Sequence, residues 1–171
     1  MIETLLALCA LPGVSGWEDA VRDYLMEQSL PYADKIETDP MGNLMVFRSG
    51  KKHDKTLMLC AHMDEVGVII TGITAEGYLK FDFVGGIDRR VVIGKSVFIG
   101  DDTIPGIIGI KAHHLSRGDK NVPAVHEMSI DIGAKTREEA ETMITLGDVG
   151  TFEPTCTRMG GLLCAKAIDD R

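Results

Sequence analysis

The chain has 171 residues, 44% of them hydrophobic and 26% charged, which is ordinary for a soluble globular protein with one domain, or with one domain and an insert. Its 18 basic and 26 acidic residues give a net charge of −8, which argues against a nucleic-acid partner because such a partner requires a basic surface. No apolar run reaches the roughly 18 residues of a membrane span, so no membrane partner is expected.

The cysteines and the N-terminal segment favour a cytoplasmic protein. No two cysteines have the Cys-x-x-Cys spacing, and two of them lie inside apolar segments, where a thiol behaves as a small hydrophobic group. We therefore expect reduced thiols and a reducing compartment. The N-terminal segment, MIETLLALCALPG, lacks the basic residues that begin a signal peptide. The four cysteines are Cys9, Cys60, Cys156 and Cys164.

Two helices are predicted in the first thirty residues. Apolar residues recur at helical spacing over Ile2–Ala10, and Pro12-Gly13 ends this pattern. Ser15 and Glu18 then stand at the spacing of a capping box, with Ser15 as the N-cap residue. This pattern predicts a second helix that ends at about Gln28.

A short β-pair and a buried strand are predicted next. Turn residues of the sequence DPMGN separate two strand-like segments, Lys35–Thr38 and Leu44–Arg48. Thr56–Ala61 is apolar without alternation, which is typical of a strand buried on both faces in an α/β sheet. It ends in a polar cluster that contains His62 and Asp64. Because residues two apart in an extended segment point the same way, these two side chains can face one site.

From residue 66 onward the sequence changes to short β-rich segments separated by Gly and Asp. No helical pattern intervenes until a short helix over Arg137–Ile144, which Thr136 caps and which has acidic residues in its first turn. Many short strands with turns at this spacing predict a small barrel or sandwich. A polar loop is expected over Lys111–Val125. The expected strands are Val68–Thr74, Tyr78–Val84, Val91–Ile99, Ile104–Ile110, Met128–Ile132 and Gly147–Phe152.

A second apolar run near the end of the chain, Leu162–Ala167, also breaks into acids, Asp169 and Asp170. Two buried strands that end in His-x-Asp and Asp-Asp can bring three or four metal-binding groups together, since imidazole and carboxylate are both metal ligands. By itself, His-x-Asp is a weak signal. A polar turn in solvent at the end of a strand is the alternative interpretation.

The motif AHMDEVG, followed much later by KAIDDR, resembles the glutamyl/deblocking aminopeptidase family of di-metal peptidases. These are the tetrahedral aminopeptidases, some of which carry the name endoglucanase. The segments LPGVSGWEDAVRDYL, DPMGNLMV and SIDIGAKTREEAE resemble the same family, so the similarity covers nearly the whole chain. The resemblance implies that His62 and Asp169 are metal ligands, with Asp169 bridging two ions. It also implies that Asp64 is a catalytic residue that orients the His62 ring, and that Asp170 follows a cis peptide bond.

The resemblance further implies an α/β fold in which a mixed-sheet di-metal exopeptidase domain, with helices on both faces, is interrupted by a β-rich, barrel-like insert. We expect the incomplete catalytic domain in residues 1–66 and 158–171 and the insert in residues 67–157. In the family the insert serves oligomer assembly and access to the site, which implies a homo-oligomer, a dodecamer by resemblance.

The activity implied is that of a metallo-aminopeptidase that removes N-terminal residues from short peptides with a water activated by two divalent ions, zinc or cobalt. The family's later ligands and its general base have no counterpart in this sequence, so the chain alone is expected neither to hold two ions firmly nor to hydrolyse peptides. The alternatives are another di-metal exopeptidase or deacylase, and a non-catalytic assembly or regulatory module.

Other ionisable residues are interpreted as structural. Two acids are expected to complement a helix start, three histidines to lie in loops, and Glu65 to point to the opposite face from Asp64. These acids are Glu138 and Glu139, and the histidines are His113, His114 and His126.

Overall fold

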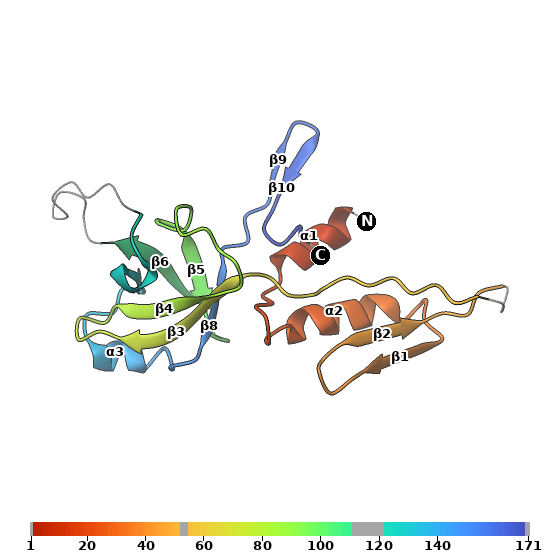
Figure 1. Cartoon of the computed structure of the whole chain (residues 1–171), viewed down its shortest axis with the longest axis horizontal. Helices are drawn as coiled ribbons and strands as arrows, with labels where there is room; N and C mark the ends of the chain where they lie inside the picture. Colours follow the sequence, from red (N-terminus) through yellow and green to blue (C-terminus); the bar gives the residue numbers. More distant parts are fainter. Residues whose placement is uncertain (1, 52–54, 111–121, 170–171) are drawn as a thin grey trace. The chain divides into compact units, whose positions relative to one another are not determined.

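The computed structural model describes residues 2–51, 55–110 and 122–169. Contacts divide the chain into two compact units, one of residues 1–65 with 154–171 and the other of residues 66–153 (Figure 1). From the sequence alone, the boundaries were expected at 66/67 and 157/158. Within the described ranges, no helix combines the length and the apolar character needed to cross a membrane.

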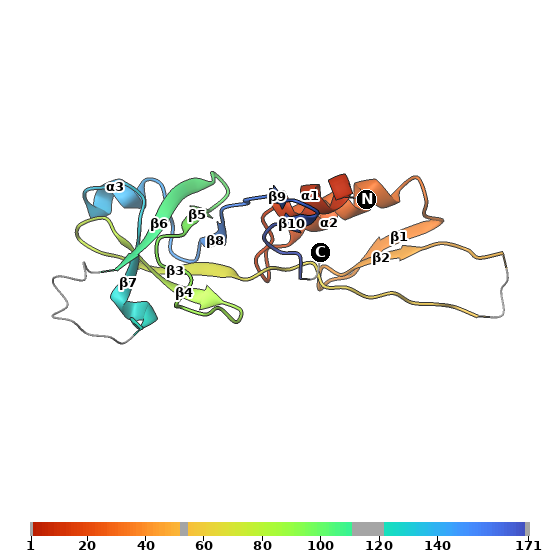
Figure 2. The same ribbon diagram turned by 90° about the horizontal axis from the view of Figure 1, so that it is seen from above.

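The first unit contains two helices and two small antiparallel β-pairs. Helix α2 lies beside the β1–β2 pair, as both views show, and it packs against β2 (Figures 1 and 2). The turn between β1 and β2 is held by Asp39, whose carboxylate accepts the backbone N–H groups of Met41 and Asn43, both at 2.9 Å. The elements are α1 (Ile2–Ala10), α2 (Asp19–Ser29), β1 (Lys35–Thr38), β2 (Leu44–Phe47), β9 (Thr157–Met159) and β10 (Leu162–Cys164).

The expected capping box at the start of α2 does not form. The helix begins at Asp19, its N-cap residue is Glu18, and Ser15 makes no capping hydrogen bond. Gly16, with φ of 89°, turns the chain tightly before the helix, and the Glu18 carboxylate accepts the Gly16 N–H at 2.8 Å. Ser15 is thereby placed outside the helix, and its hydroxyl donates to Asp64 instead. Hydrogen bonds to an ionised carboxylate are stronger than those between neutral groups, so this contact holds the Ser15 side chain firmly.

The buried strand expected over Thr56–Ala61 is wrong for the described structure. Residues 56–61 form no strand, and Leu57, Met58 and Leu59 are 84%, 80% and 86% exposed. A strand that is apolar on both faces needs neighbouring strands and covering layers, and the described residues supply neither. For the same reason the last apolar run forms only the short hairpin strand β10, in which Leu162 is 71% exposed. Cys60, Cys156 and Cys164 are exposed free thiols.

The second unit is a closed six-stranded antiparallel barrel, which confirms the β-rich architecture expected from the sequence (Figure 1). The strand order around the barrel is β3-β4-β7-β6-β5-β8. Closure pairs every strand on both sides and leaves no exposed edge. The strands are β3 (Gly67–Ile73), β4 (Leu79–Val84), β5 (Ser96–Ile99), β6 (Ile104–Ile110), β7 (Met128–Asp131) and β8 (Val149–Phe152), accompanied by η2 (Val125–Glu127) and α3 (Arg137–Glu141).

Two local expectations in this unit need correction. The strand expected over Val91–Ile99 begins only at Ser96, because residues 88–95 form turns closed by hydrogen bonds such as Lys95 N–H to Val92 O at 3.0 Å. The helix capped by Thr136 ends at Glu141 rather than Ile144. Most of the expected polar loop 111–125 lies outside the described residues.

The barrel core is built from the inward-facing residues of each strand. Ile130 of β7 is directly opposite Leu79 of β4 and Ile108 of β6, and all three side chains are fully buried. The core also contains Val68, Ile70, Val97, Ile99 and Met128. By contrast, the buried apolar side chains in the described part of the first unit are Cys9, Val14 and Val21. The barrel therefore has a substantial core of its own.

The close approach of β6 to Ile130 gives a stability prediction. A methyl group on Gly106 would lie 2.5 Å from Cγ2 of Ile130 and 3.2 Å from Cγ2 of Ile132. Because Ile130 is fully buried, it cannot move aside cheaply, and Gly106→Ala should destabilise the barrel by about 1–3 kcal/mol. Gly86→Ala, which meets nothing within 4 Å, is the control in chemical denaturation. Equal stabilities for the two variants would contradict the packing described.

The exposed apolar residues Leu57, Met58 and Leu59 give a second prediction. Three consecutive apolar side chains on unpaired backbone promote association between chains. Replacing Leu57 and Leu59 by Lys should abolish concentration-dependent association in light scattering, while changing unfolding stability by less than about 0.5 kcal/mol because both side chains are already exposed. Met41→Lys, at 86% exposure but in a separate turn, should not have this effect. Association that persists in the double variant would rule out this segment as its cause.

Candidate functional site

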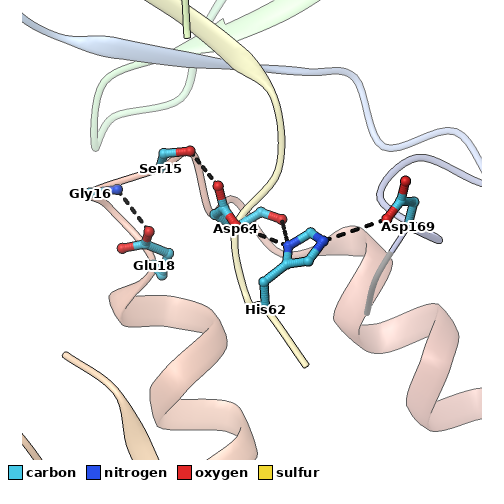
Figure 3. Close-up of polar contacts among 6 residues, drawn as sticks. All are labelled: Ser15, Gly16, Glu18, His62, Asp64 and Asp169. Carbon is cyan, nitrogen blue, oxygen red and sulfur yellow. Dashed lines mark hydrogen bonds and ion pairs between the residues drawn. The ribbon is translucent and has the colours of Figure 1, made fainter. Parts of the chain in front are cut away.

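Three residues that the sequence analysis singled out lie together in the first unit. His62 and Asp64 follow the extended segment, and Asp169 lies in the turn after β10 (Figure 3). The His62 ring lies between the two carboxylates. Its Nδ1 is 2.9 Å from Oδ1 of Asp64, and its Nε2 is 3.5 Å from Oδ1 of Asp169. Asp170, where the cis peptide bond is expected, lies outside the described residues.

The surroundings of Nδ1 determine the tautomer of His62. Besides the Asp64 carboxylate, the backbone oxygen of Asp64 lies 3.2 Å from Nδ1. Both neighbours are acceptors, so Nδ1 carries the proton and donates it. In the neutral ring, Nε2 then keeps its lone pair and points toward Asp169. This is the arrangement in which histidine ligates a metal, with a carboxylate holding the opposite ring nitrogen.

Asp64 is itself held in place by Ser15. The Ser15 hydroxyl donates to Oδ2, while Oδ1 accepts from the histidine, so both carboxylate oxygens are engaged (Figure 3). The Ser15 hydrogen bond is the largest influence on this group, and with the His62 contact it outweighs desolvation and lowers the pKa of Asp64. The carboxylate is therefore ionised near neutral pH and can orient the imidazole.

The same contacts act on His62 in the opposite sense. Desolvation of the ring lowers the pKa of His62, but its interactions with the Asp169 and Asp64 carboxylates outweigh desolvation and raise the pKa. A raised pKa for His62 and a lowered pKa for Asp64 are both expected when an imidazole lies between two carboxylates. The site therefore favours a positive charge at this position, supplied either by a proton or by a metal ion.

The separation of 3.5 Å between His62 Nε2 and Asp169 Oδ1 fits two ligand atoms on one ion. It is longer than a normal hydrogen bond between nitrogen and oxygen. Two ligands at about 2.1 Å from a tetrahedral ion are themselves about 3.4 Å apart. The side chains are also accessible, at 50% exposure for His62 and 99% for Asp169. The donor set and its spacing therefore fit a divalent ion.

An open pocket of about 430 Å³ lies beside His62 and Asp64. Apolar side chains from α2, β2 and the extended segment form much of its wall. Such a wall can accept an apolar group of a ligand while the polar residues meet its polar end. Residues lining it include Leu25, Leu44, Val46, Leu59, Met63 and Glu18.

Other candidates from the sequence do not join this site. Glu65 forms an ion pair with Lys166, at 2.6 Å, and Glu138 and Glu139 lie in the first turn of α3 in the other unit. His126 belongs to η2, and His113 and His114 lie outside the described residues. Across the described ranges, no three His, Cys, Asp or Glu side chains gather closely enough to hold a metal ion.

Ser15 is the site residue that sequence reasoning missed. Its spacing to Glu18 matched a helix cap, which concealed its role. The signal that could have identified it is Gly16, because a glycine directly after the proposed cap favours a turn rather than the first helical residue. Lys166 was missed because it was counted within an apolar strand.

The contact between Ser15 and Asp64 gives a pH-dependent prediction. A carboxylate with a lowered pKa contributes stability above its unfolded-state value of about 3.9, and this contribution is lost as the pH falls through the folded-state pKa. Ser15→Ala should raise the pKa of Asp64 in an NMR titration. It should lower the free energy of unfolding by about 1 kcal/mol at pH 7. This is less than the loss expected for a fully buried charged hydrogen bond, because Asp64 is 36% exposed.

This loss of stability in Ser15→Ala should vanish at a pH low enough to protonate Asp64 in both proteins. It should also be much smaller when Ser15→Ala is made in an Asp64→Asn background. An Asp64 titration that is unchanged in Ser15→Ala would show that the serine does not hold this carboxylate.

Comparison with known proteins identifies the family. The profile of the M42 glutamyl aminopeptidases matches residues 42–171. A protein of Acetivibrio thermocellus with a provisional aminopeptidase name is 36% identical over 171 residues, which cover 100% of this chain and 50% of that protein. The chain spans about half the length of the curated relatives it matches.

Solved structures agree with this comparison. Aminopeptidase APDkam598 from the archaeon Desulfurococcus kamchatkensis has a TM-score of 0.92 at 34% identity, covering 99% of this chain and 48% of that one. The Pyrococcus horikoshii TET1 peptidase, described as assembling into a tetrahedron or a large octahedral shell, has a TM-score of 0.87 at 36% identity over 99% and 52% of the two chains. The chain belongs to the M42 glutamyl aminopeptidase family.

Proposed function

We propose that this chain supplies part of the active site of a metallo-aminopeptidase, in which His62 and Asp169 bind divalent metal ions and Asp64 orients His62. The observation that carries this proposal is the His62 imidazole, which is held by Asp64 at Nδ1 and faces the Asp169 carboxylate through Nε2. Aminopeptidase activity is the function named for the family, and the site chemistry is compatible with it.

Asp169 is suited to bridge two ions. One carboxylate oxygen faces His62, and because the side chain is 99% exposed, the other oxygen is accessible to a second ion. A carboxylate with two accessible oxygens can join two metals at the roughly 3.5–4 Å spacing of two-metal hydrolases. Histidine with carboxylates suits several divalent ions, of which we propose zinc or cobalt.

Bound metal would polarise the scissile carbonyl and activate a water molecule. The contribution of the chain's own residues is to orient the ligands. Asp64 accepts a hydrogen bond from the Nδ1–H of His62, which leaves the lone pair of the neutral ring on Nε2, and Ser15 fixes the Asp64 carboxylate that does this. The pocket lined by Leu25, Leu44 and Val46 lies beside these groups, and we propose that it receives part of a short peptide substrate.

Two ligands do not make a complete catalytic centre. Among the described residues, no group of three His, Cys, Asp or Glu side chains is arranged to hold a metal ion. Since the chain spans about half the length of its relatives, we propose that the remaining ligands and the base come from polypeptide beyond residues 1–171. The chain alone should then bind metal weakly and show no peptidase activity. We further propose a cytoplasmic homo-oligomer, in line with the assemblies named for the TET1 peptidase.

The second candidate is a non-catalytic assembly module. The exposed apolar segment at Leu57, Met58 and Leu59 favours it, because such a segment can pair with another chain. The expected alternative of a different exopeptidase or deacylase class is not supported by the family match. Metal binding at His62 separates the remaining two candidates, since an assembly module has no need of a metal ligand there.

Metal titration tests the proposed function. Titration of the chain with Co²⁺, followed by absorption and calorimetry, should reveal weak binding that depends on His62 and Asp169. His62→Ala and Asp169→Asn should each weaken it by more than about 100-fold, beyond the roughly 10–100-fold typical of groups that only orient a ligand. Asp64→Asn should fall within that smaller range.

His126→Ala is the matched control, because His126 lies exposed in the barrel unit and should leave the titration unchanged. Co²⁺ binding that is equal in the His62→Ala and wild-type chains would refute the assignment. Turnover of an aminoacyl chromogenic substrate by the chain alone would refute the need for further polypeptide.

A further inference from the structure

A buried ion pair lies in the same compact unit as the candidate site. Lys166 Nζ is 2.6 Å from Oε1 of Glu65, and the two side chains are only 11% and 5% exposed. Most ion pairs in the described structure are far more exposed, such as Lys35 with Glu37 at 62% and 53%. Charges are rarely buried unless they are paired and hydrogen-bonded, because desolvation is costly. A buried pair in a unit with few buried side chains therefore calls for an explanation.

The pair joins the two sequence segments that carry the site. Glu65 directly follows Asp64, and Lys166 precedes Asp169 by three residues. The same two residues also contact the loop after α1. Lys166 Nζ donates to the backbone oxygen of Leu11 at 3.1 Å, and the Glu65 N–H donates to the backbone oxygen of Gly13 at 2.8 Å. All these partners belong to the first compact unit.

The loop formed by residues 11–15 thus holds both segments at once. It accepts hydrogen bonds from Lys166 and Glu65, it pairs with Glu65 through a parallel bridge at the buried Val14, and it ends with Ser15 bonded to Asp64. Neither segment around the site is in a regular strand of its own at this point. Their mutual position depends on these contacts.

The turn between Lys166 and Asp169 supports the same interpretation. Ala167 has φ of 53°, in the left-handed region that non-glycine residues rarely adopt. A residue stays in that region only where its surroundings hold it there. Anchoring Lys166 on Glu65 and Leu11 fixes the start of this turn, and the turn then carries Asp169 toward His62.

We propose that Glu65 and Lys166 are positioning residues of the metal centre, an ion pair that sets the separation between His62 and Asp169. The inference rests on the proposed function, because it assumes that these two side chains share a metal. In this proposal the ion pair is not a metal ligand. It determines the position of Asp169 before the metal binds. Loss of the ion pair should therefore lower metal affinity more than it lowers the stability of the fold.

The test compares the single variants Glu65→Leu and Lys166→Met with the double variant in Co²⁺ titrations of the whole chain. Each single variant removes one member of the buried ion pair and should lower both the unfolding temperature and Co²⁺ affinity. In the double variant both members of the pair are replaced by apolar side chains, so the unfolding temperature should recover. Co²⁺ affinity should stay roughly 10–100-fold below that of the wild type, since the segments are no longer held in register.

Two controls separate positioning from general destabilisation. Lys35→Met removes an exposed ion pair of the same 2.6 Å length and should change neither measurement. Val21→Ala removes buried packing in α2 and should lower the unfolding temperature without lowering Co²⁺ affinity. Wild-type affinity in the double variant, or an equal loss of affinity in Val21→Ala, would overturn the proposal.

A metal-free measurement distinguishes this proposal from the proposed function. Amide hydrogen exchange at residues 167–169 should be faster in the double variant than in wild type and in Lys35→Met. Faster exchange in a chain that binds no Co²⁺ would leave the ion pair as the determinant of the turn while refuting the metal centre. Unchanged exchange would refute the positioning role whether or not the wild-type chain binds Co²⁺.

Discussion

The hydrogen bond from the His62 ring to the Asp64 carboxylate determines what the remaining site residues can do. Because both oxygens near Nδ1 are acceptors, the ring donates there and presents the lone pair of Nε2 toward Asp169. Without this constraint the ring could adopt either tautomer and rotate freely at 50% exposure. Ser15 fixes the second oxygen of Asp64, so a hydroxyl that lies 49 residues away in the sequence contributes to the orientation of the imidazole.

The two units differ in what stabilises them. The barrel closes on itself, buries a core centred on residues such as Ile130, and pairs the edges of all its strands. The first unit has few buried apolar residues and exposes Leu57, Met58 and Leu59. In it, hydrogen bonds and the buried pair of Glu65 with Lys166 hold the segments that carry the candidate site. Such polar contacts are specific in geometry, which suits the proposed metal site, whose two ligand atoms would lie about 3.4 Å apart.

The parts that sequence reasoning predicted are those governed by local chemistry. Gly and Asp at regular spacing indicated the barrel strands, and the alternation of an extended segment placed His62 and Asp64 on one side. The errors arose where contacts with residues distant in the sequence determine the local structure. Ser15 matched a helix cap but bonds to Asp64, and Thr56–Ala61 has the composition of a buried strand but lacks neighbours to bury it. Lys166 was counted as strand because nothing local reveals its pairing with Glu65, 101 residues away.

The most direct test of this account is the state of the His62 ring when metal is added. Long-range ¹H–¹⁵N NMR spectra of the chain, recorded with and without Cd²⁺, report which ring nitrogen carries the proton and which one binds the ion. The account predicts a protonated Nδ1 in both spectra and a shift of Nε2 on addition of Cd²⁺, both lost when Asp64 is replaced by Asn. A neutral ring that carries its proton on Nε2 instead of Nδ1, or a ring unaffected by Cd²⁺, would contradict the central claim that Asp64 prepares His62 as a metal ligand.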